Sequence, residues 1–243
     1  VPALQPLIND PDPSVRIAAY FALERCGLPS TEHRTRWRDH LRNHENPEVR
    51  RNAVLALGQL NDKATIPLLR IAASSDSDEG VRTQALEGLA LLGDKDAINR
   101  FTFEAFGGVG YKQPFALMTL GQVPDDRVVP TLRSKLASSP YLEAKLAAAR
   151  GLGVKGHADG LELAMRSLDW SKPDRNLPED RPENQIMRVR SMAAMALGEI
   201  GDRKALAKLK KTMENPEDPR VQLAAATAIL MIVDRETRQP TVR

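Results

Sequence analysis

The chain has 243 residues, which is long enough for two ordinary domains or for one elongated array of repeats. A hydrophobic content of 42% is sufficient for a continuous core, and an aromatic content of only 4% indicates that this core is aliphatic. The formal net charge is only +3, which does not indicate a nucleic-acid-binding protein. The single cysteine, Cys26, excludes an intrachain disulfide and a cysteine-based zinc site. No apolar run is long enough to cross a bilayer.

Seven segments of the chain align with one another without gaps over fourteen residues. They begin at residues that we call anchors: Val15, Val49, Val81, Lys112, Ala144, Val189 and Val221. The intervals between successive anchors are 34, 32, 31, 32, 45 and 32 residues. A period in this range is typical of stacked supersecondary units.

Each aligned segment predicts an amphipathic helix. Apolar or small residues recur at helical spacing, as Val49, Ala53 and Leu57 do in repeat two. A second amphipathic stretch precedes each segment, from residues 1–8 in repeat one to stretches such as residues 64–73 further on. We therefore expect seven helical hairpins, about fourteen helices and no strands, stacked so that each hairpin buries its apolar face against its neighbours.

The repeat junctions carry matching helix-capping residues. A residue that can cap a helix stands three positions before four anchors: Asp12, Asn46, Asp78 and Asp218. Proline follows directly in three of them: Pro13, Pro47 and Pro219. Glycines suited to a left-handed C-terminal cap end four of the helices: Gly27, Gly93, Gly156 and Gly201.

The combined pattern, D-x-D-P-x-V-R-x-x-A-A-x-A-L-G-x-x-G-D, resembles the HEAT-like repeats named after phycobilisome chromophore lyases. The resemblance covers residues 1–234. It implies one all-α domain, an α-solenoid wound as a right-handed superhelix of about seven HEAT-like repeats, with a polar tail at residues 235–243. It does not imply one function, because such repeats occur in scaffolds, lyases, a hydroxylase and DNA-repair proteins.

Arginine follows the anchor in four repeats. These residues are Arg16, Arg50, Arg82 and Arg190, with Gln113, Lys145 and Gln222 at the same position in repeats four, five and seven. An arginine ladder can bind phosphates or an acidic partner. Carboxylates near the junctions, such as Asp76 and Asp78, favour a structural role instead, because a guanidinium pairs with a carboxylate and ties one repeat to the next.

The first helix of repeat two contains a cluster of histidines. On a helical projection, one stripe holds His33, Trp37, His40 and His44. His40 and His44 have a spacing that can bind a metal ion. The repeat alignment places Trp37 opposite Leu69, however, so we expect a packing face rather than a metal site. The hydroxylases of this family carry several His-Glu pairs, and only His44-Glu45 matches, which argues against that activity.

The same helix carries four arginines around Trp37. They are Arg34, Arg36, Arg38 and Arg42. Basic residues beside an aromatic ring can hold a nucleic-acid strand. Glu32 and Asp39 dilute the charge, and we therefore expect a solvated arginine face.

Two segments interrupt the repeat pattern. Residues 107–110 read GGVG but lack the Lys-Ser/Thr of a phosphate-binding loop, so they predict a turn and a distorted start to the second helix of repeat four. This is where we expect the solenoid to bend. Residues 169–185 form a polar, proline-rich insertion. Its Trp170 is either an exposed anchor for a partner or packs back onto the neighbouring helix.

The second helix of each hairpin is expected to line the concave face of the solenoid. Six positions past the anchors lie the residues that we call the inner column: Phe21, Leu55, Glu87, Met118, Arg150, Met195 and Thr227. The alternative is that some of them complete the core between repeats. We predict partner contacts at Phe21, Leu55, Met118, Arg150, Met195 and Trp170, and at Ile17 and Arg51 two positions past the anchors.

These features predict a non-enzymatic scaffold that contacts another protein through the concave face. No nucleophile–base pair or carboxylate pair is identifiable, so we predict no catalytic residue, no cofactor and no bound metal. The alternative is a lyase-like or DNA-repair-like protein with a concave basic pocket. We expect a monomer that does not bind nucleic acid.

The chain begins at Val1, inside a helix-like segment. We expect a processed or excised piece, which a leader segment or further repeats can precede. The cytoplasm is the expected compartment, and an exported bacterial protein is the alternative.

Overall fold

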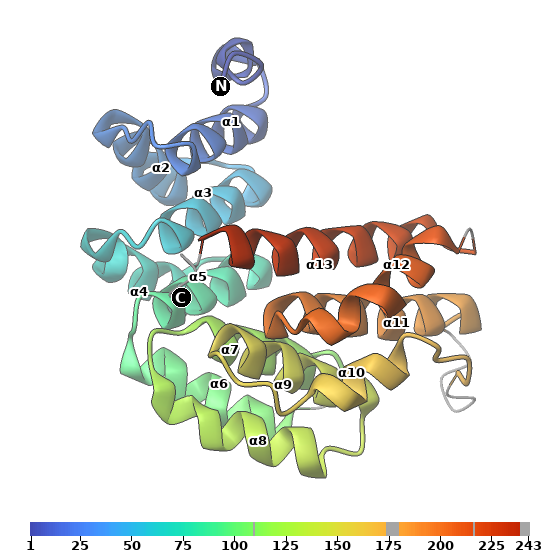
Figure 1. Ribbon diagram of the computed structural model, residues 1–243. Helices are drawn as coiled ribbons and strands as arrows, with labels where there is room; N and C mark the ends of the chain where they lie inside the picture. Colours follow the sequence, from blue (N-terminus) through green and yellow to red (C-terminus); the bar gives the residue numbers. More distant parts are fainter. Residues whose placement is uncertain (109, 174–179, 216, 239–243) are drawn as a thin grey trace. The chain divides into compact units, whose positions relative to one another are not determined.

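The computed structural model describes residues 1–108, 110–173, 180–215 and 217–238. Over these residues it contains thirteen α-helices, four short 3-10 helices and no strand (Figure 1). The helices alternate as hairpins in chain order. The predicted all-α solenoid class is confirmed.

Each anchor lies in a helix of its own, the second of its hairpin. These anchored helices are α1 (Pro13–Arg25), α3 (Pro47–Gln59), α5 (Glu79–Leu91), α7 (Lys112–Gln122), α9 (Leu142–Val154), α11 (Pro182–Ile200) and α13 (Pro219–Arg238). The first helices are η1 (Gln5–Asn9), α2 (Thr31–Asn43), α4 (Ile66–Ser75), α6 (Lys95–Gly107), α8 (Val129–Ser138), α10 (Leu161–Ser167) and α12 (Leu206–Glu214). The remaining 3-10 helices directly precede α4, α8 and α12: η2 (Lys63–Thr65), η3 (Asp126–Val128) and η4 (Arg203–Ala205).

The predicted capping residues have the predicted roles. Asp12 Oδ1 accepts a hydrogen bond from the Ser14 backbone N–H at 2.7 Å, and the equivalent side chains of repeats two, three and seven cap α3, α5 and α13. All four predicted C-terminal glycines have a positive φ. In repeat two Asn61 takes the same conformation, with a φ of 55°, because asparagine tolerates the left-handed region better than most residues.

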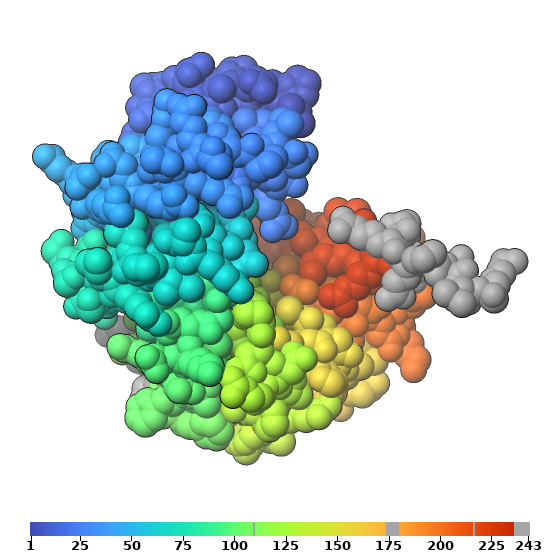
Figure 2. All heavy atoms as spheres, turned by 90° about the vertical axis from the view of Figure 1, so that its left-hand side faces the viewer, coloured from blue at the N-terminus to red at the C-terminus, as the bar shows by residue number. Residues whose placement is uncertain are grey.

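The chain divides into two compact units, Val1–Ile98 and Asn99–Arg243, and the division falls inside α6. In the first unit α3 stacks between α1 and α5, while α2 and α4 cover α3 and α5 (Figure 1). Figure 2 shows these helices as successive bands in sequence order, from blue to cyan. Trp37, Leu57 and Leu69 are fully buried and form the centre of this unit.

The second unit stacks α7, α9, α11 and α13 in that order, with α8, α10 and α12 packed on α9, α11 and α13. Its core contains many alanines, such as Ala193, Ala194 and Ala225, around larger side chains such as Leu197. Small side chains at these contacts let neighbouring helices approach closely.

Glycines mark the closest of these approaches. A Cβ added to Gly121 of α7 would lie 2.3 Å from the Cα of Gly151 in α9. In the first unit, a Cβ on Gly58 of α3 would lie 2.8 Å from the Cα of Gly88 in α5. Any side chain at these positions would therefore push two helix backbones apart.

The irregular segments differ in detail from their predictions. Gly107 ends α6, and Gly110, between α6 and α7, has a φ of 63°, as expected of a turn. Helix α11 begins at Pro182, inside the predicted insertion, because a helix tolerates proline in its first turn. Helix α13 continues to Arg238, inside the predicted tail. Residues 174–179 of the insertion and 239–243 of the tail lie outside the described residues.

Candidate functional site

Three of the predicted contact residues line one apolar depression in the first unit, which we call the α1–α3 hollow. It is lined by Ser14, Ile17, Ala18, Phe21, Asn52, Leu55 and Ala56. Ile17 is only 3% exposed and belongs to its floor, whereas Phe21 is partly buried and Leu55 is exposed. No carboxylate, amine, imidazole or thiol lines the hollow, so it offers apolar contact edged by one hydroxyl and one amide.

The hollow lies between α1 and α3, and α1 lacks a glycine that other anchored helices carry where they meet the next one. Nine positions past the anchor, repeats two, four, five and six carry a glycine that meets the next anchored helix: Gly58, Gly121, Gly153 and Gly198. In repeat one this position is Glu24, whose buried carboxylate accepts hydrogen bonds from Arg34 Nε and Nη2 at 3.1 and 2.8 Å. Repeat one therefore has a carboxylate paired with α2 at the position where four other repeats have glycine.

In the second unit the inner column is more polar. Arg150 Nη1 of α9 lies 4.0 Å from Met118 Sδ of α7, and Arg150 Nη2 lies 3.5 Å from Glu199 Oε1 of α11. Glu199 Oε2 also accepts from Arg235 Nη2 of α13 at 3.4 Å. Met195 is partly buried and packs against the core. The four anchored helices are thus joined by a row of side chains that is only partly exposed.

The other two predicted contact residues lie away from these groups. Trp170 is partly buried and packs against the core of the second unit, which is the packed alternative. Its backbone carbonyl accepts a hydrogen bond from Arg190 Nε at 2.8 Å. Arg51 is exposed on α3, and its Nε lies 3.9 Å from Asp78 Oδ1 at the start of α5.

The arginines that follow the anchors make structural contacts, as predicted. Arg50 Nη1 donates to the backbone carbonyls of His44 and Glu45, which lie six and five residues earlier. Arg16 and Arg82 make the equivalent pair of hydrogen bonds. Arg50 also pairs with Asp76 of the next repeat, with Nη2 2.8 Å from Oδ1. Arg190 pairs with Glu217 of the next repeat at 2.7 Å. These guanidinium groups tie repeat to repeat.

Comparison with known families agrees with this repeated geometry. A family model described as HEAT repeats matches residues 35–102 and 183–238, which is more than half of the chain. A second model, described as a HEAT repeat, matches residues 1–27. The chain is a HEAT-repeat protein.

Two solved structures are similar to this chain at low sequence identity. The complex of CpcE and CpcF of phycocyanin lyase from Nostoc sp. PCC7120 is 20% identical, with a TM-score of 0.55 over 96% of this chain and 91% of that chain. Human deoxyhypusine hydroxylase in complex with glycerol is 17% identical, with a TM-score of 0.44 over 93% of this chain and 82% of that chain. No curated protein matches the sequence. At 20% identity, the similarity to the CpcE–CpcF complex shows the fold alone.

The histidine stripe on α2 belongs to the packing of HEAT repeats one and two. Trp37 is fully buried, as the packing interpretation predicts, and the ring centroid of His33 lies 3.5 Å from that of Tyr20 on α1. Burial lowers the pKa of His40, and the neighbouring His44 adds to this effect. Among the described residues, no group of three His, Cys, Asp or Glu side chains is arranged to hold a metal ion.

The arginines around Trp37 are largely paired. Arg34 binds Glu24, Arg36 binds Glu32 at 2.7 Å, and Arg38 binds Asp62, the N-cap residue of η2. These pairs neutralise most of the charge that a nucleic-acid strand would need.

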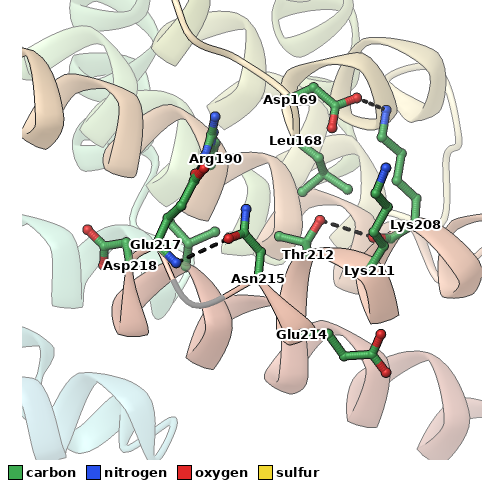
Figure 3. A pocket seen from close by; sticks show the side chains of 11 residues that line it. Leu168, Asp169, Arg190, Lys208, Lys211, Thr212, Glu214, Asn215, Glu217 and Asp218 are labelled. Atoms are coloured by element: carbon green, nitrogen blue, oxygen red, sulfur yellow. Dashed lines mark hydrogen bonds and ion pairs between the residues drawn. The ribbon is translucent and has the colours of Figure 1, made fainter.

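A second kind of depression recurs beside the arginine that follows the anchor. In the first unit it is lined by Arg50, Asp76 and, among others, Leu68 and Ile71. In the second unit Lys208 and Lys211 take the positions of these two apolar residues (Figure 3). Lys208 reaches Asp169 at 2.6 Å on one rim, while Arg190 and Glu217 lie on the other. The second-unit depression is lined by three cationic and four carboxylate side chains. It therefore has no net positive charge to attract an anion.

Sequence reasoning missed Glu24 and Gln113 as determinants of these surfaces. Glu24 stands at the position that is glycine in repeats two, four, five and six, and Gln113 stands at the position that is arginine in repeats one, two, three and six. That departure from the repeat pattern was the available signal. Over the described residues, no helix is long and apolar enough to cross a membrane.

Proposed function

We propose that this HEAT-repeat protein is a non-enzymatic scaffold that binds another protein through its inner column, with the α1–α3 hollow as the main contact pocket. The observation that carries the proposal is the convergence of Ile17, Phe21 and Leu55 on one apolar depression. An apolar concavity with few polar groups suits an apolar side chain or helix face of a partner.

The second unit supplies an adaptable contact of a different kind. Met118 and Arg150 are both partly exposed and touch each other. Methionine fits irregular partner surfaces, and arginine is enriched at protein interfaces. A partner that contacts this pair needs a carboxylate or carbonyl opposite Arg150. The CpcE–CpcF structure is itself a complex of two protein chains, which supports a protein as the partner.

Affinity capture with matched variants tests the proposal. Leu55→Glu puts a charge in the hollow, and Ile71→Glu does so at an exposed apolar position outside it. We expect a protein that is retained at high salt by the wild type and by Ile71→Glu, and lost with Leu55→Glu. Thermal melts of all three must agree, so that loss of binding is not loss of fold. An identical set retained by all three contradicts the hollow assignment.

The lyase-like or DNA-repair-like alternative predicts a different result. It requires a basic pocket, whereas Arg34 and Arg38 are engaged with Glu24 and Asp62. A strongly salt-dependent gel shift with DNA, unaffected by Leu55→Glu, would favour this alternative and overturn the scaffold proposal.

A further inference from the structure

Four of the ten aromatic side chains are exposed, and all four belong to repeats four and five of the second unit. Their exposed fractions are 76% for Phe103, 53% for Phe106, 77% for Tyr111 and 52% for Tyr141. The other six aromatic residues are buried or partly buried. Exposed rings gathered in one region usually mark a contact surface, because burying them contributes strongly to binding.

Gln113 holds the segments that carry these rings together. It stands at the position that is arginine in repeats one, two, three and six, and it is buried. Its Nε2 donates to the carbonyl of Ala105, the neighbour of Phe106, at 2.9 Å. Its Oε1 accepts from the Ser139 hydroxyl at 2.9 Å, and Ser139 Oγ in turn accepts from the backbone N–H of Tyr141 at 3.3 Å. Tyr111 is only two residues before Gln113, so the rings share one edge of the repeats, which we call the aromatic edge.

The rings have no role in the core. On α6, Phe101 is the inward-facing ring and stacks against Phe115 of α7 with centroids 5.9 Å apart. Phe103 and Phe106 lie three residues apart, so they share another face of the same helix. Tyr111 and Tyr141 are the N-cap residues of α7 and α9, which lie side by side, and neither side chain makes a cap hydrogen bond.

The aromatic edge is positively charged. Lys135 Nζ lies 4.2 Å from the ring centroid of Phe106. Among the described residues, no carboxylate lies within ion-pair distance of Lys135, or of Lys112 and Lys145 beside the two tyrosines. The nearby Glu104 and Glu143 are paired with Arg100 and Arg188 instead. The edge therefore presents apolar rings among uncompensated lysines.

We propose that the aromatic edge binds an acidic peptide segment of a partner protein, with apolar side chains of that segment on the exposed rings and its carboxylates opposite Lys112, Lys135 and Lys145. This surface is separate from the α1–α3 hollow, which lies in the other unit. A nucleic-acid strand is less favoured, because the lysines are few and the anchor-following arginines are occupied within the repeats.

A random dodecapeptide display library, selected on the full chain, tests this proposal. Counter-selection uses the Phe103→Ser, Tyr111→Ser, Tyr141→Ser variant, whose substituted side chains are exposed, so the fold should persist in a thermal melt. We expect enriched peptides that are acidic and contain apolar anchors. Synthetic copies should bind the triple variant at least about tenfold more weakly than the wild type in fluorescence polarisation.

Two further variants make the outcome decisive. Leu223→Ser with Leu230→Ser removes equally exposed apolar side chains from α13 and should leave the affinity unchanged. Lys112→Glu with Lys135→Glu should abolish the acidic preference. Neutral or basic enriched peptides, or no loss with the triple variant, overturn the proposal. Binding of oligothymidylate that depends on the same rings assigns the edge to nucleic acid and overturns it as well.

Discussion

At the scale of single residues, the position after the anchor holds the entry turn of its own repeat and, in repeats two, four and six, also contacts the next repeat. The residue after the anchor is Arg16, Arg50 or Arg82 in repeats one to three, and each donates to the carbonyls of its own entry turn. In repeat four this residue is Gln113, whose side-chain amide donates to the Ala105 carbonyl and accepts a hydrogen bond from the Ser139 hydroxyl. The position is therefore a structural bridge, and changing its chemistry changes which surface the repeat edge offers.

Replacing Asp76 by Asn tests the bridge from Arg50. Both side chains are nearly buried, with exposed fractions of 11% for Arg50 and 9% for Asp76. Asn keeps an acceptor for the Asp78 N–H but loses the charge. We expect Asp76→Asn to lower the free energy of unfolding by about 2–4 kcal/mol at pH 7 in urea denaturation.

The same variant has a defined pH dependence. The hydrogen-bonded Arg50 guanidinium lowers the pKa of Asp76. The stabilisation is therefore present above the pKa of the unfolded chain, about 4, and is lost as the pH falls below it. The gap between wild type and variant should close between about pH 5 and pH 2. As a control, Glu214→Gln breaks the exposed Lys210–Glu214 pair and should cost about 0.5 kcal/mol or less. Equal costs for both variants would contradict the bridging role.

At the scale of helices, the stacking distance is set by small residues. Gly121 and Gly151 bring α7 and α9 together at the backbone, and Gly58 and Gly88 do the same for α3 and α5. Between α1 and α3, where the hollow lies, repeat one has Glu24 at the position that is glycine in four other repeats.

Gly121→Ala tests how much the close backbone contact between α7 and α9 contributes to stability. The added Cβ would meet the backbone of Gly151, so the helices must separate. We expect a loss of about 2 kcal/mol in thermal unfolding, even though alanine favours helix by about 1 kcal/mol. Gly107→Ala is the matched control, because a Cβ there meets no atom within 4 Å. If Gly121→Ala is as stable as Gly107→Ala, the close approach is not the basis of stacking.

The helices and their ends were predictable because they depend on local chemistry. The spacing of Val49, Ala53 and Leu57 and the capping side chain of Asn46 are repeated along the chain and specify the α3 boundaries closely. The candidate sites were only partly predictable. Phe21 and Leu55 were predicted as column residues, whereas the pairing of Glu24 with Arg34, a contact between two repeats, was not predicted. The aromatic edge depends on the tertiary hydrogen bonds of Gln113, which the sequence pattern does not contain.

At the scale of the whole molecule, stability is expected to be local. Each hairpin of a repeat array contacts mainly its neighbours, so damage in one repeat should spread only a short distance. The chain has two compact units, and the candidate surfaces are distributed between them, with the α1–α3 hollow in the first and the aromatic edge in the second. Each surface can then be tested without destroying the other.

Ala53→Glu tests this locality. Ala53 is fully buried in α3, so a carboxylate there should destabilise its surroundings by about 3 kcal/mol or more. Hydrogen exchange followed by mass spectrometry should show faster exchange in α1, α3 and α5, with little change in α11 and α13. A uniform increase along the chain would instead show that the array unfolds as one cooperative unit.

The central claim, that the α1–α3 hollow binds a protein, is tested most directly by site-specific photocross-linking in the source organism. A photoreactive phenylalanine analogue is placed at position 55, inside the hollow, and in a matched strain at position 71, exposed outside it. We predict that the photoreactive residue at position 55 forms a discrete protein adduct and that the one at position 71 forms none. A nucleic-acid adduct, or the same adducts from both positions, would contradict it.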